Sequence, residues 1–429
     1  MQRAIYNLTF YLAIPFLLLR LLLRSIKAPA YRARWGERFA CINVPANAGA
    51  EKGCIWVHAV SVGETIAAIP LIQQLQSVHP KRLVIVTTTT PTGSDRVQQL
   101  LGDSVFHVYA PYDLPGAVKR FLARVQPSIF IIMETELWPN AIHYCHKHGV
   151  KIMLTNARLS KKSATGYDRI KQISRQMLSK VDFITAQSQP DADRFVVLGA
   201  DPEKILVTGS LKFDVEFSAG LNSLSPALDS MRKTQRPVFV AASTREGEDK
   251  KILSVLRMCL EQIPNLLLVL VPRHPERFNS AARLCEENGF NVQRRSADVV
   301  VGDSTEVLLG DSMGELLCYY RLADIAFVGG SLVDTGCQNV LEPAALGIPV
   351  LVGPSQFNFE HICNQLEEAG GLITVADEAE LARCVIDLLS NRVKIQEMGD
   401  TNRKLVEANR GALPATLEQA NKLLSESTQ

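Results

Sequence analysis

The sequence lacks the features of several specialised protein classes. With 26 glycines and 21 prolines among 429 residues, it has too few of either for a fibrous or low-complexity chain, and it shows no repeat of solenoid period. It also lacks the basic excess of a general nucleic-acid binder, because 46 basic and 44 acidic side chains almost balance. The 47% share of hydrophobic residues excludes an intrinsically disordered chain. The length therefore predicts a globular protein of two or three domains.

Closely spaced cysteine pairs are missing as well. The nine cysteines, an odd number, are scattered singly along the chain, and no Cys-x-x-Cys motif occurs. This usage is typical of a reducing compartment, where cysteine behaves as a small buried apolar residue. We therefore expect the bulk of the chain to lie in the cytoplasm.

Charge is absent from a stretch near the N-terminus. No charged residue occurs from Ala4 to Leu19, and the apolar run continues past Arg20, whereas the first 40 residues hold seven basic side chains and one acid, Glu37. A cleaved signal peptide would carry its positive charges first and a small-residue cleavage site last. The order here is the reverse, so the stretch predicts a membrane anchor. It either spans the bilayer with its C-terminal end in the cytoplasm or lies in the interface. The alternative to an anchor is a helix buried within the protein itself.

The rest of the chain alternates short apolar runs with helical patterns. In the first half the predicted strands are Ile55–His58, Leu83–Thr88, Ile129–Met133, Lys151–Thr155, Phe183–Ala186 and Ile205–Thr208. In the second half they are Val238–Ala242, Leu266–Val271, Ile325–Val328, Pro349–Val352 and Leu372–Val375. Continuous apolar runs are typical of parallel strands covered by helices on both faces. The expected fold is α/β, with two Rossmann-like domains facing a cleft and ligands at the carboxyl ends of the strands.

These patterns predict five segments. They are a membrane anchor with a basic neck (1–30), an N-terminal domain (31–214), a polar linker (215–236), a C-terminal domain (237–392) and a C-terminal helical segment (393–429).

The first motif at a strand end runs from His58 to Thr65, where a short Ser/Gly turn leads into an apolar-periodic helix. Glu64 in this turn has two interpretations. It is either an acid in the first turn that stabilises the helix dipole, or a general base that takes a proton from a hydroxyl group. The spacing alone leaves both open.

Other charged residues also follow predicted strands. Glu134 and Glu136 come directly after Ile129–Met133, as capping residues or as site residues. Lys212 and Arg273 follow strands in the two halves. Cations at strand ends suit a phosphate-bearing ligand, and the alternative is that they are ordinary surface cations.

A glycine-containing loop follows the predicted strand Ile325–Val328. Gly329–Leu332 and the segment from Gly336 to Ala345 allow close approach of the backbone to a ligand, and the following helix start can receive a phosphate. This combination is a moderate signal of nucleotide-sugar binding, in which an acid of the first turn holds ribose hydroxyls.

Two patterns that look metal-binding have simpler interpretations. Asp191 and Asp193 have the spacing of a DxD motif, but they precede an apolar helical pattern and so favour a helix start. His143 and His146 have no distant pair that completes four zinc ligands, which favours a helix end stopped by Gly149.

Taken together, the motifs resemble the Kdo transferases, which attach 3-deoxy-D-manno-octulosonic acid (Kdo) to the lipid A precursor of Gram-negative bacteria. The resemblance covers nearly the whole chain, and its motifs keep their order. They are Arg34–Arg38, His58–Glu64, Glu134–Asn140, Gly209–Asp214, Pro272–Phe278, Asp311–Glu315 and Gly329–Leu332.

The resemblance implies a glycosyltransferase of lipopolysaccharide biosynthesis with the GT-B fold. The implied reaction is an inverting, metal-independent transfer of one or more Kdo units from CMP-Kdo to the tetraacyl lipid A precursor (lipid IVA). It implies a transmembrane or interfacial anchor at the cytoplasmic face of the bacterial inner membrane. No cofactor, no metal site and no nucleic-acid partner are expected.

Residue by residue, the resemblance implies that Glu64 is the general base and that Glu134 and Lys212 stabilise the transition state. The positions that match the donor-binding segments are Pro272, Arg273, Met313, Gly314, Glu315, Asn339, Val340, Leu341 and Glu342. The sequence departs from the family pattern at Arg245 and Gln338, where histidine is expected. Gln338 still offers a hydrogen-bond donor but carries no charge.

Two other functions fit parts of the same pattern. One is a GT-B transferase that uses a UDP-sugar on a lipid carrier, and the other is a membrane-tethered nucleotide-binding protein without catalysis. The acids Glu64 and Glu134 argue against the second, because a site that only binds an anion gains nothing from carboxylates.

Overall fold

The computed structural model describes residues 2–27, 29–45, 53–214, 228 and 236–427. Their contacts group the chain into two compact units, of which unit 1 comprises Met1–Asp214 with Asn409–Gln429 and unit 2 comprises Val215–Ala408. The domain boundaries expected from the sequence stay predictions. The last residues belong to unit 1, whereas the sequence pattern grouped them with 393–408, and the expected linker 215–236 lies outside the described residues except at Leu228 and Arg236.

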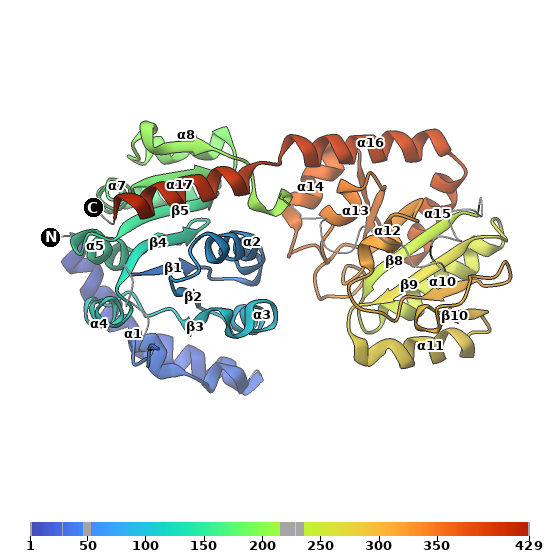
Figure 1. Cartoon of the computed structure of the whole chain (residues 1–429), viewed down its shortest axis with the longest axis horizontal. Helices are drawn as coiled ribbons and strands as arrows, with labels where there is room; N and C mark the ends of the chain where they lie inside the picture. Colours follow the sequence, from blue (N-terminus) through green and yellow to red (C-terminus); the bar gives the residue numbers. More distant parts are fainter. Residues whose placement is uncertain (1, 28, 46–52, 215–227, 229–235, 428–429) are drawn as a thin grey trace. The chain divides into compact units, whose positions relative to one another are not determined.

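Among the described residues of unit 1, seven parallel strands form one sheet in the order β3-β2-β1-β4-β5-β6-β7 (Figure 1). The strands are β1 (Cys54–His58), β2 (Val84–Thr88), β3 (Phe106–Tyr109), β4 (Pro127–Met133), β5 (Lys151–Ala157), β6 (Phe183–Ala186) and β7 (Ile205–Val207). The helices are α1 (Gln2–Lys27), α2 (Val62–Val78), α3 (Pro91–Leu101), α4 (Pro115–Val125), α5 (Pro139–Lys147), α6 (Lys161–Arg169), α7 (Lys171–Leu178), α8 (Gln189–Val197) and α17 (Ala412–Glu426). Five 3-10 turns lie between these elements in the described part of unit 1: η1 (Pro29–Arg32), η2 (Trp35–Phe39), η3 (Gly102–Ser104), η4 (Pro202–Lys204) and η5 (Leu211–Phe213).

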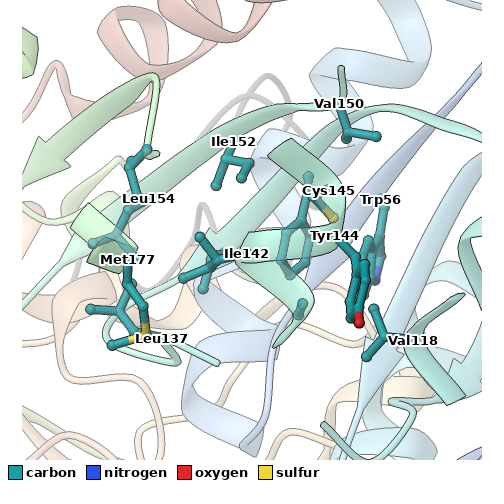
Figure 2. Packing of buried hydrophobic residues seen from close by; sticks show 14 of the residues in the cluster. Trp56, Val118, Leu137, Ile142, Tyr144, Cys145, Val150, Ile152, Leu154 and Met177 are labelled. Carbon is teal, nitrogen blue, oxygen red and sulfur yellow. The ribbon is translucent and has the colours of Figure 1, made fainter. Parts of the chain in front are cut away.

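The sheet of unit 1 is buried on both faces. Successive residues of β1 enter different clusters, with Ile55 and Val57 on one face and Trp56 on the other. Trp56 stacks on Phe130 of β4 with ring centroids 3.7 Å apart, and Figure 2 shows Trp56 within the cluster on this face. A strand with apolar partners on both faces reads as a continuous apolar run, which is why the sequence pattern reveals it.

Helix α17 completes unit 1 from the far end of the sequence. It packs against α2, β4, β5 and η5 (Figure 1), and it contributes Ala412, Leu413 and Leu424 to the core. Asp214 holds its start, because one carboxylate oxygen accepts the amide of Gly411 at 2.8 Å and the other accepts that of Leu413 at 2.6 Å. The chain therefore leaves unit 1 at a residue that also fixes the returning helix.

Unit 2 has a second sheet of the same kind. Among its described residues, seven parallel strands take the order β10-β11-β9-β8-β12-β13-β14. The strands are β8 (Val238–Thr244), β9 (Leu267–Pro272), β10 (Val292–Arg294), β11 (Val307–Leu309), β12 (Ile325–Val328), β13 (Val350–Val352) and β14 (Leu372–Thr374). The helices are α10 (Glu248–Leu260), α11 (Phe278–Glu287), α12 (Leu316–Tyr320), α13 (Leu341–Ala345), α14 (Glu360–Glu368), α15 (Glu378–Leu389) and α16 (Arg392–Ala408).

The two parallel α/β sheets confirm the predicted fold class. All eleven predicted strands are present within two residues of the expected bounds, and the sequence pattern missed β3, β10 and β11. Two of the missed strands are at sheet edges and carry polar residues, His107 in β3 and Gln293 in β10, which break the apolar run. The third, β11, is buried but has only three residues, too few for a periodic signal.

Candidate active site

The functional residues predicted in unit 1 follow three strands of one parallel sheet. Glu64 follows β1, Glu134 follows β4 directly, and Lys212 lies in η5 after β7. Because the strands are parallel, these segments leave the sheet at the same carboxyl edge, where α/β proteins place their ligands.

Glu64 is fixed by the start of α2. Ser61 is the N-cap, and its hydroxyl oxygen accepts the amide of Glu64 at 3.3 Å. In return the carboxylate of Glu64 accepts the Ser61 hydroxyl at 2.8 Å and the amide of Val60 at 2.8 Å. This is a variant of the capping box, in which the acid accepts the amide of the residue before the cap, Val60, in place of the cap's own amide. The helix-start interpretation is thus realised in the structure, and it leaves a carboxylate of fixed orientation.

The surroundings of Glu64 change its acidity. Its side chain is 7% exposed, and this burial raises the pKa from 4.5 to about 7, with further increases from the negative charges of Glu134 and Glu136. The hydrogen bonds from Val60 and Ser61 act in the opposite direction. A pKa near neutrality is what general-base catalysis at physiological pH requires.

Glu134 has an unusual backbone conformation. Its φ of +54° is in the left-handed region, and its amide donates to the carbonyl of Thr155 at 2.9 Å. Such a conformation costs a non-glycine residue on the order of 1–3 kcal/mol and is concentrated at functional sites. Glu136, two residues on, accepts a hydrogen bond from the indole of Trp138 at 3.0 Å, and burial raises its pKa. Glu136 is therefore tied to its own turn.

Lys212 lies beside the start of α2. Its ammonium nitrogen is 3.6 Å from the position that a Cβ atom on Gly63 would occupy, so the glycine leaves room for it next to Glu64. The turn that carries Lys212 is anchored by the buried side chains of Leu211 and Phe213. The amide of Leu211 also donates to Asn156 Oδ1 at 3.0 Å. The structure thus gathers Glu64, Glu134 and Lys212 in one region of unit 1.

His58 begins the same motif but has no acid–base role at neutral pH. It is 2% exposed, and its Nδ1 lies 2.9 Å from the hydroxyl of Thr87. Burial lowers its pKa to about 4, so the imidazole is neutral. The edge of its ring meets Trp138 at a centroid distance of 5.0 Å. His58 therefore packs the strand end from which the Glu64 turn departs.

The two metal-like patterns of unit 1 are helix termini, as expected. Asp191 follows the N-cap Ser188 of α8 and accepts the amide of Leu159 at 2.9 Å. His146 lies in the last turn of α5 and His143 one turn earlier, and Gly149 has the left-handed φ of a helix stop.

In unit 2 four loops leave neighbouring strands at one edge of the sheet. They follow β11, β9, β8 and β12, which are adjacent in that order. Arg273 directly follows β9. Burial raises the pKa of Glu342, and the nearby positive charge of Arg273 acts in the opposite direction. The side-chain amide of Asn339 donates to Glu342 Oε1 at 3.1 Å. These three residues form the polar centre of this edge.

The remaining donor-site candidates differ in exposure. Val340 and Leu341 are fully buried core residues, and Pro272 is buried as the last residue of β9. Only their backbone groups are therefore available to a ligand.

The turn from Met313 to Glu315 is more open. Met313 is 62% exposed, and a Cβ atom on Gly314 would meet nothing within 4 Å. Glu315 accepts a hydrogen bond from Arg295 at 2.8 Å and also bonds the Ser312 hydroxyl. Its carboxylate therefore fixes the turn that precedes α12.

Glu248 is a residue that the sequence analysis missed. It is fully buried, and its carboxylate accepts the amides of Arg245 at 2.8 Å, Gly330 at 2.6 Å and Leu332 at 2.9 Å. It joins the loop after β8 to the glycine loop after β12. Two of its partners, Gly330 and Leu332, lie more than 80 residues away in the sequence, so no local signal reveals the contact between the two loops.

The structure also places the two departures from the family pattern. Arg245 contacts His274 Nε2 through a guanidinium nitrogen at 2.5 Å. Gln338 donates to the carbonyl of Gly336 at 3.3 Å, within its own loop. Both side chains are therefore used inside the loops that border the carboxyl edge of unit 2.

Two Rossmann-like units of this kind, one with buried acids and the other with a cationic, glycine-bearing strand edge, fit the GT-B fold, in which many glycosyltransferases are built. In agreement, the structure of MurG from Acinetobacter baumannii resembles this chain with a TM-score of 0.54, covering 86% of this chain and 99% of that one. At 10% sequence identity this likeness shows the fold alone.

Comparison with the sequences of known proteins shows the family to which this chain belongs. The model of the 3-deoxy-D-manno-octulosonic-acid transferase (kdotransferase) family matches residues 33–215, and that of glycosyl transferases group 1 matches 235–410. The chain is 43% identical to the 3-deoxy-D-manno-octulosonic acid transferase of Haemophilus influenzae over 97% of its length and 98% of the relative's. The enzyme of the same name from Bordetella pertussis is 38% identical, over 91% and 90%. The chain belongs to the Kdo transferases, which confirms the resemblance seen in its motifs.

Proposed function

We propose that this enzyme transfers one or more Kdo units from CMP-Kdo to the tetraacyl lipid A precursor, with inversion and without a metal ion. We place the reaction at the cytoplasmic face of the inner membrane. The observation that carries the proposal is the capping-box geometry of Glu64, a buried carboxylate with a pKa of about 7 beside Lys212. The family supports Kdo as the transferred sugar.

In the proposed mechanism Glu64 accepts the proton of the acceptor hydroxyl. The hydroxyl oxygen then bonds to the anomeric carbon of Kdo while the bond from that carbon to the CMP phosphate oxygen breaks. A single displacement of this kind inverts the configuration, because the nucleophile attacks the face opposite the leaving group. Glu64 remains protonated at the end of the step and loses the proton to water.

Charged side chains stabilise the charges that develop in this step. The departing phosphate becomes more negative, and Arg273 or Lys212 meets that charge as preorganised cations. The sugar ring becomes more positive as its bond to phosphate lengthens, and Glu134 is the carboxylate assigned to that charge. The strained backbone of Glu134 supports a functional role, because the conformation costs stability.

The donor is assigned to the carboxyl edge of unit 2. Arg273 provides a cation for the phosphate of CMP, and Asn339 and Glu342 provide polar groups for the ribose hydroxyls. Gly314 and Gly330 have positive φ values and let the backbone approach the ligand.

The test is mass spectrometry of the lipid product. The purified full chain is incubated with CMP-Kdo and the tetraacyl lipid A precursor in the presence of EDTA. Wild type and the control Glu203→Ala, an exposed acid of unit 1, are expected to add Kdo, and Glu64→Ala to add none. Product from Glu64→Ala would refute the assigned base. Product from a UDP-sugar in place of CMP-Kdo would refute the assigned donor.

A further inference from the structure

Helix α1 has two faces along its whole length. One face is half-buried or buried against unit 1, and its residues recur at helical spacing. They are Arg3, Tyr6, Asn7, Phe10, Ala13, Ile14, Leu17, Leu18, Leu21 and Ser25. Because α1 also contacts α7 and η1 of unit 1, the helix is docked on this unit.

Specific contacts hold the first half of α1 on unit 1. The Tyr6 hydroxyl donates to the carboxylate of Asp113 at 2.9 Å, and Asn7 accepts the side-chain amide of Asn140 at 2.7 Å. Asp113 is 2% exposed and also accepts the amides of Asn140 and Ala141 at the start of α5. Two polar residues within the apolar stretch, Tyr6 and Asn7, therefore bind the body of the protein.

The second half of α1 is held by the chain that follows it. Arg32 of η1 donates to the Ser25 hydroxyl at 2.9 Å, and the guanidinium of Arg24 lies 5.7 Å from the ring centre of Tyr31. Arg34, the next basic residue, pairs with Glu37 at 2.7 Å and donates to the carbonyl of His107 in β3. The chain is thus attached to unit 1 at both ends of the helix.

The opposite face of α1 is apolar and exposed. At 100° per residue its nine large apolar side chains fall within an arc of about 140°. They are Ile5, Leu8, Tyr11, Leu12, Phe16, Leu19, Leu22, Leu23 and Ile26, each at least 48% exposed, with Phe16 at 74%. A continuous exposed apolar face of this length marks a surface that contacts a membrane or another protein.

The charges of α1 indicate what covers this face. The helix contains no acidic residue, and the exposed Arg20 lies next to one border of the apolar arc, followed one turn later by the exposed Arg24. Apolar side chains flanked by arginines are complementary to the acyl chains and anionic headgroups of one bilayer leaflet.

We propose that α1 is an in-plane membrane helix: it stays docked on unit 1 and inserts only its outer face into one leaflet. This inference deepens the membrane association of the proposed function. The helix from Arg3 to Ile26 is long and apolar enough to cross a bilayer, but crossing requires it to leave unit 1. Crossing would also remove the Tyr6 hydroxyl from Asp113 and leave a buried carboxylate short of one hydrogen bond.

The test is a depth measurement by electron paramagnetic resonance. Four outer-face positions are spin-labelled one at a time as Ile5→Cys, Leu12→Cys, Leu19→Cys and Ile26→Cys. The background carries Cys41→Ser and Cys384→Ser, since the other seven cysteines are buried. The full chain is bound to vesicles of phosphatidylethanolamine and phosphatidylglycerol, and collision with oxygen and with a water-soluble nickel chelate gives the depth of each label. Val197→Cys, on the exposed surface of α8, is the control.

For an in-plane helix we expect equal, shallow depths at all four positions and no lipid contact at position 197. Two deep central labels between two shallow outer ones would show a spanning helix and overturn the proposal. Labels that meet neither collision reagent would show that a second copy covers the face, which also overturns it. Labels in water throughout would refute membrane association itself. The lipid-product assay, run with acceptor in detergent, would then show separately whether Kdo transfer stands.

Discussion

The hydroxyl of Ser61 and the carboxylate of Glu64 satisfy each other across the first turn of α2. Ser61 donates to the carboxylate at 2.8 Å and accepts the amide of Glu64 at 3.3 Å. The orientation of the proposed base is therefore set by the same contact that starts the helix. Ser61 is therefore a positioning residue for Glu64. Its substitution should change the pH dependence of the reaction in a defined direction.

Ser61→Ala is expected to move the acid limb of the pH–rate profile to higher pH. A base works only when deprotonated, so activity falls as the pH drops through the pKa of Glu64, about 7 in the native protein. Loss of the Ser61 hydrogen bond removes an interaction that lowers this pKa, and loss of the cap destabilises the fold by about 1 kcal/mol. Ser61→Thr, which keeps the hydroxyl, should restore the profile. An unchanged limb in Ser61→Ala would contradict the positioning role.

Glu64→Gln is expected to abolish transfer and yet stabilise the protein at pH 8. A folded-state pKa of about 7 against an ordinary 4.5 means that the native state binds the proton more tightly than the unfolded state. Stability is therefore lost as the pH rises from about 4.5 to about 7. The neutral amide avoids that loss, worth roughly 1–3 kcal/mol. Thermal unfolding at pH 8 and pH 4.5 tests this, since the advantage should vanish at the lower pH.

Glu248→Ala is expected to raise KM for the CMP-sugar donor more than it lowers kcat. The substitution leaves three amides, two of them buried, without their acceptor and costs about 1–3 kcal/mol of stability in unit 2. It also releases the glycine loop after β12 from the loop after β8. The exposed neighbour Glu246 provides the matched control, Glu246→Ala, which should leave both constants unchanged. Equal kinetics for the two variants would show that the tie is irrelevant to donor binding.

Asp214→Ala is expected to loosen α17 and to lower transfer with it. The variant loses the acceptors for Gly411 and Leu413 at the start of the helix, a loss of about 0.5–2 kcal/mol. Hydrogen exchange in residues 409–427 should accelerate, because the helix start frays. The exposed α17 position Glu418, changed to alanine, serves as the comparison. Slow exchange in Asp214→Ala would mean that the apolar face of α17 alone holds it.

Much of the fold can be predicted from local patterns in the sequence. Central strands such as β1 and β4 are buried on both faces, so their sequences are uninterrupted apolar runs that can be read directly. Edge strands such as β3 carry polar residues and have no such signal. The helical pattern of α17 is also visible, but not its partner, because its contact with Asp214 spans 199 residues at Leu413.

The candidate site also has features that the sequence predicts and features that it does not. The position of Glu64 at a helix start follows from the Ser-x-x-Glu spacing, and the structure shows that helix capping and a raised pKa coexist in one carboxylate. Its proximity to Glu134 depends on how β1 and β4 pair, which no local spacing encodes. The role of Glu248 could not be predicted from the sequence for the same reason. Two of the amides that donate to its carboxylate belong to a loop after a strand that is distant in the sequence.

The discontinuity of unit 1 has a consequence for biosynthesis. Residues 409–427 are translated after the whole of Val215–Ala408. They nevertheless complete the hydrophobic core around Leu211 and contact η5, the turn that carries Lys212. While the ribosome is still translating unit 2, the first unit therefore has all seven strands of its sheet but an uncovered face. The turn that carries Lys212 gains its contact with α17 only when the last helix emerges, so premature termination within α17 is expected to yield an inactive chain that has been almost fully synthesised.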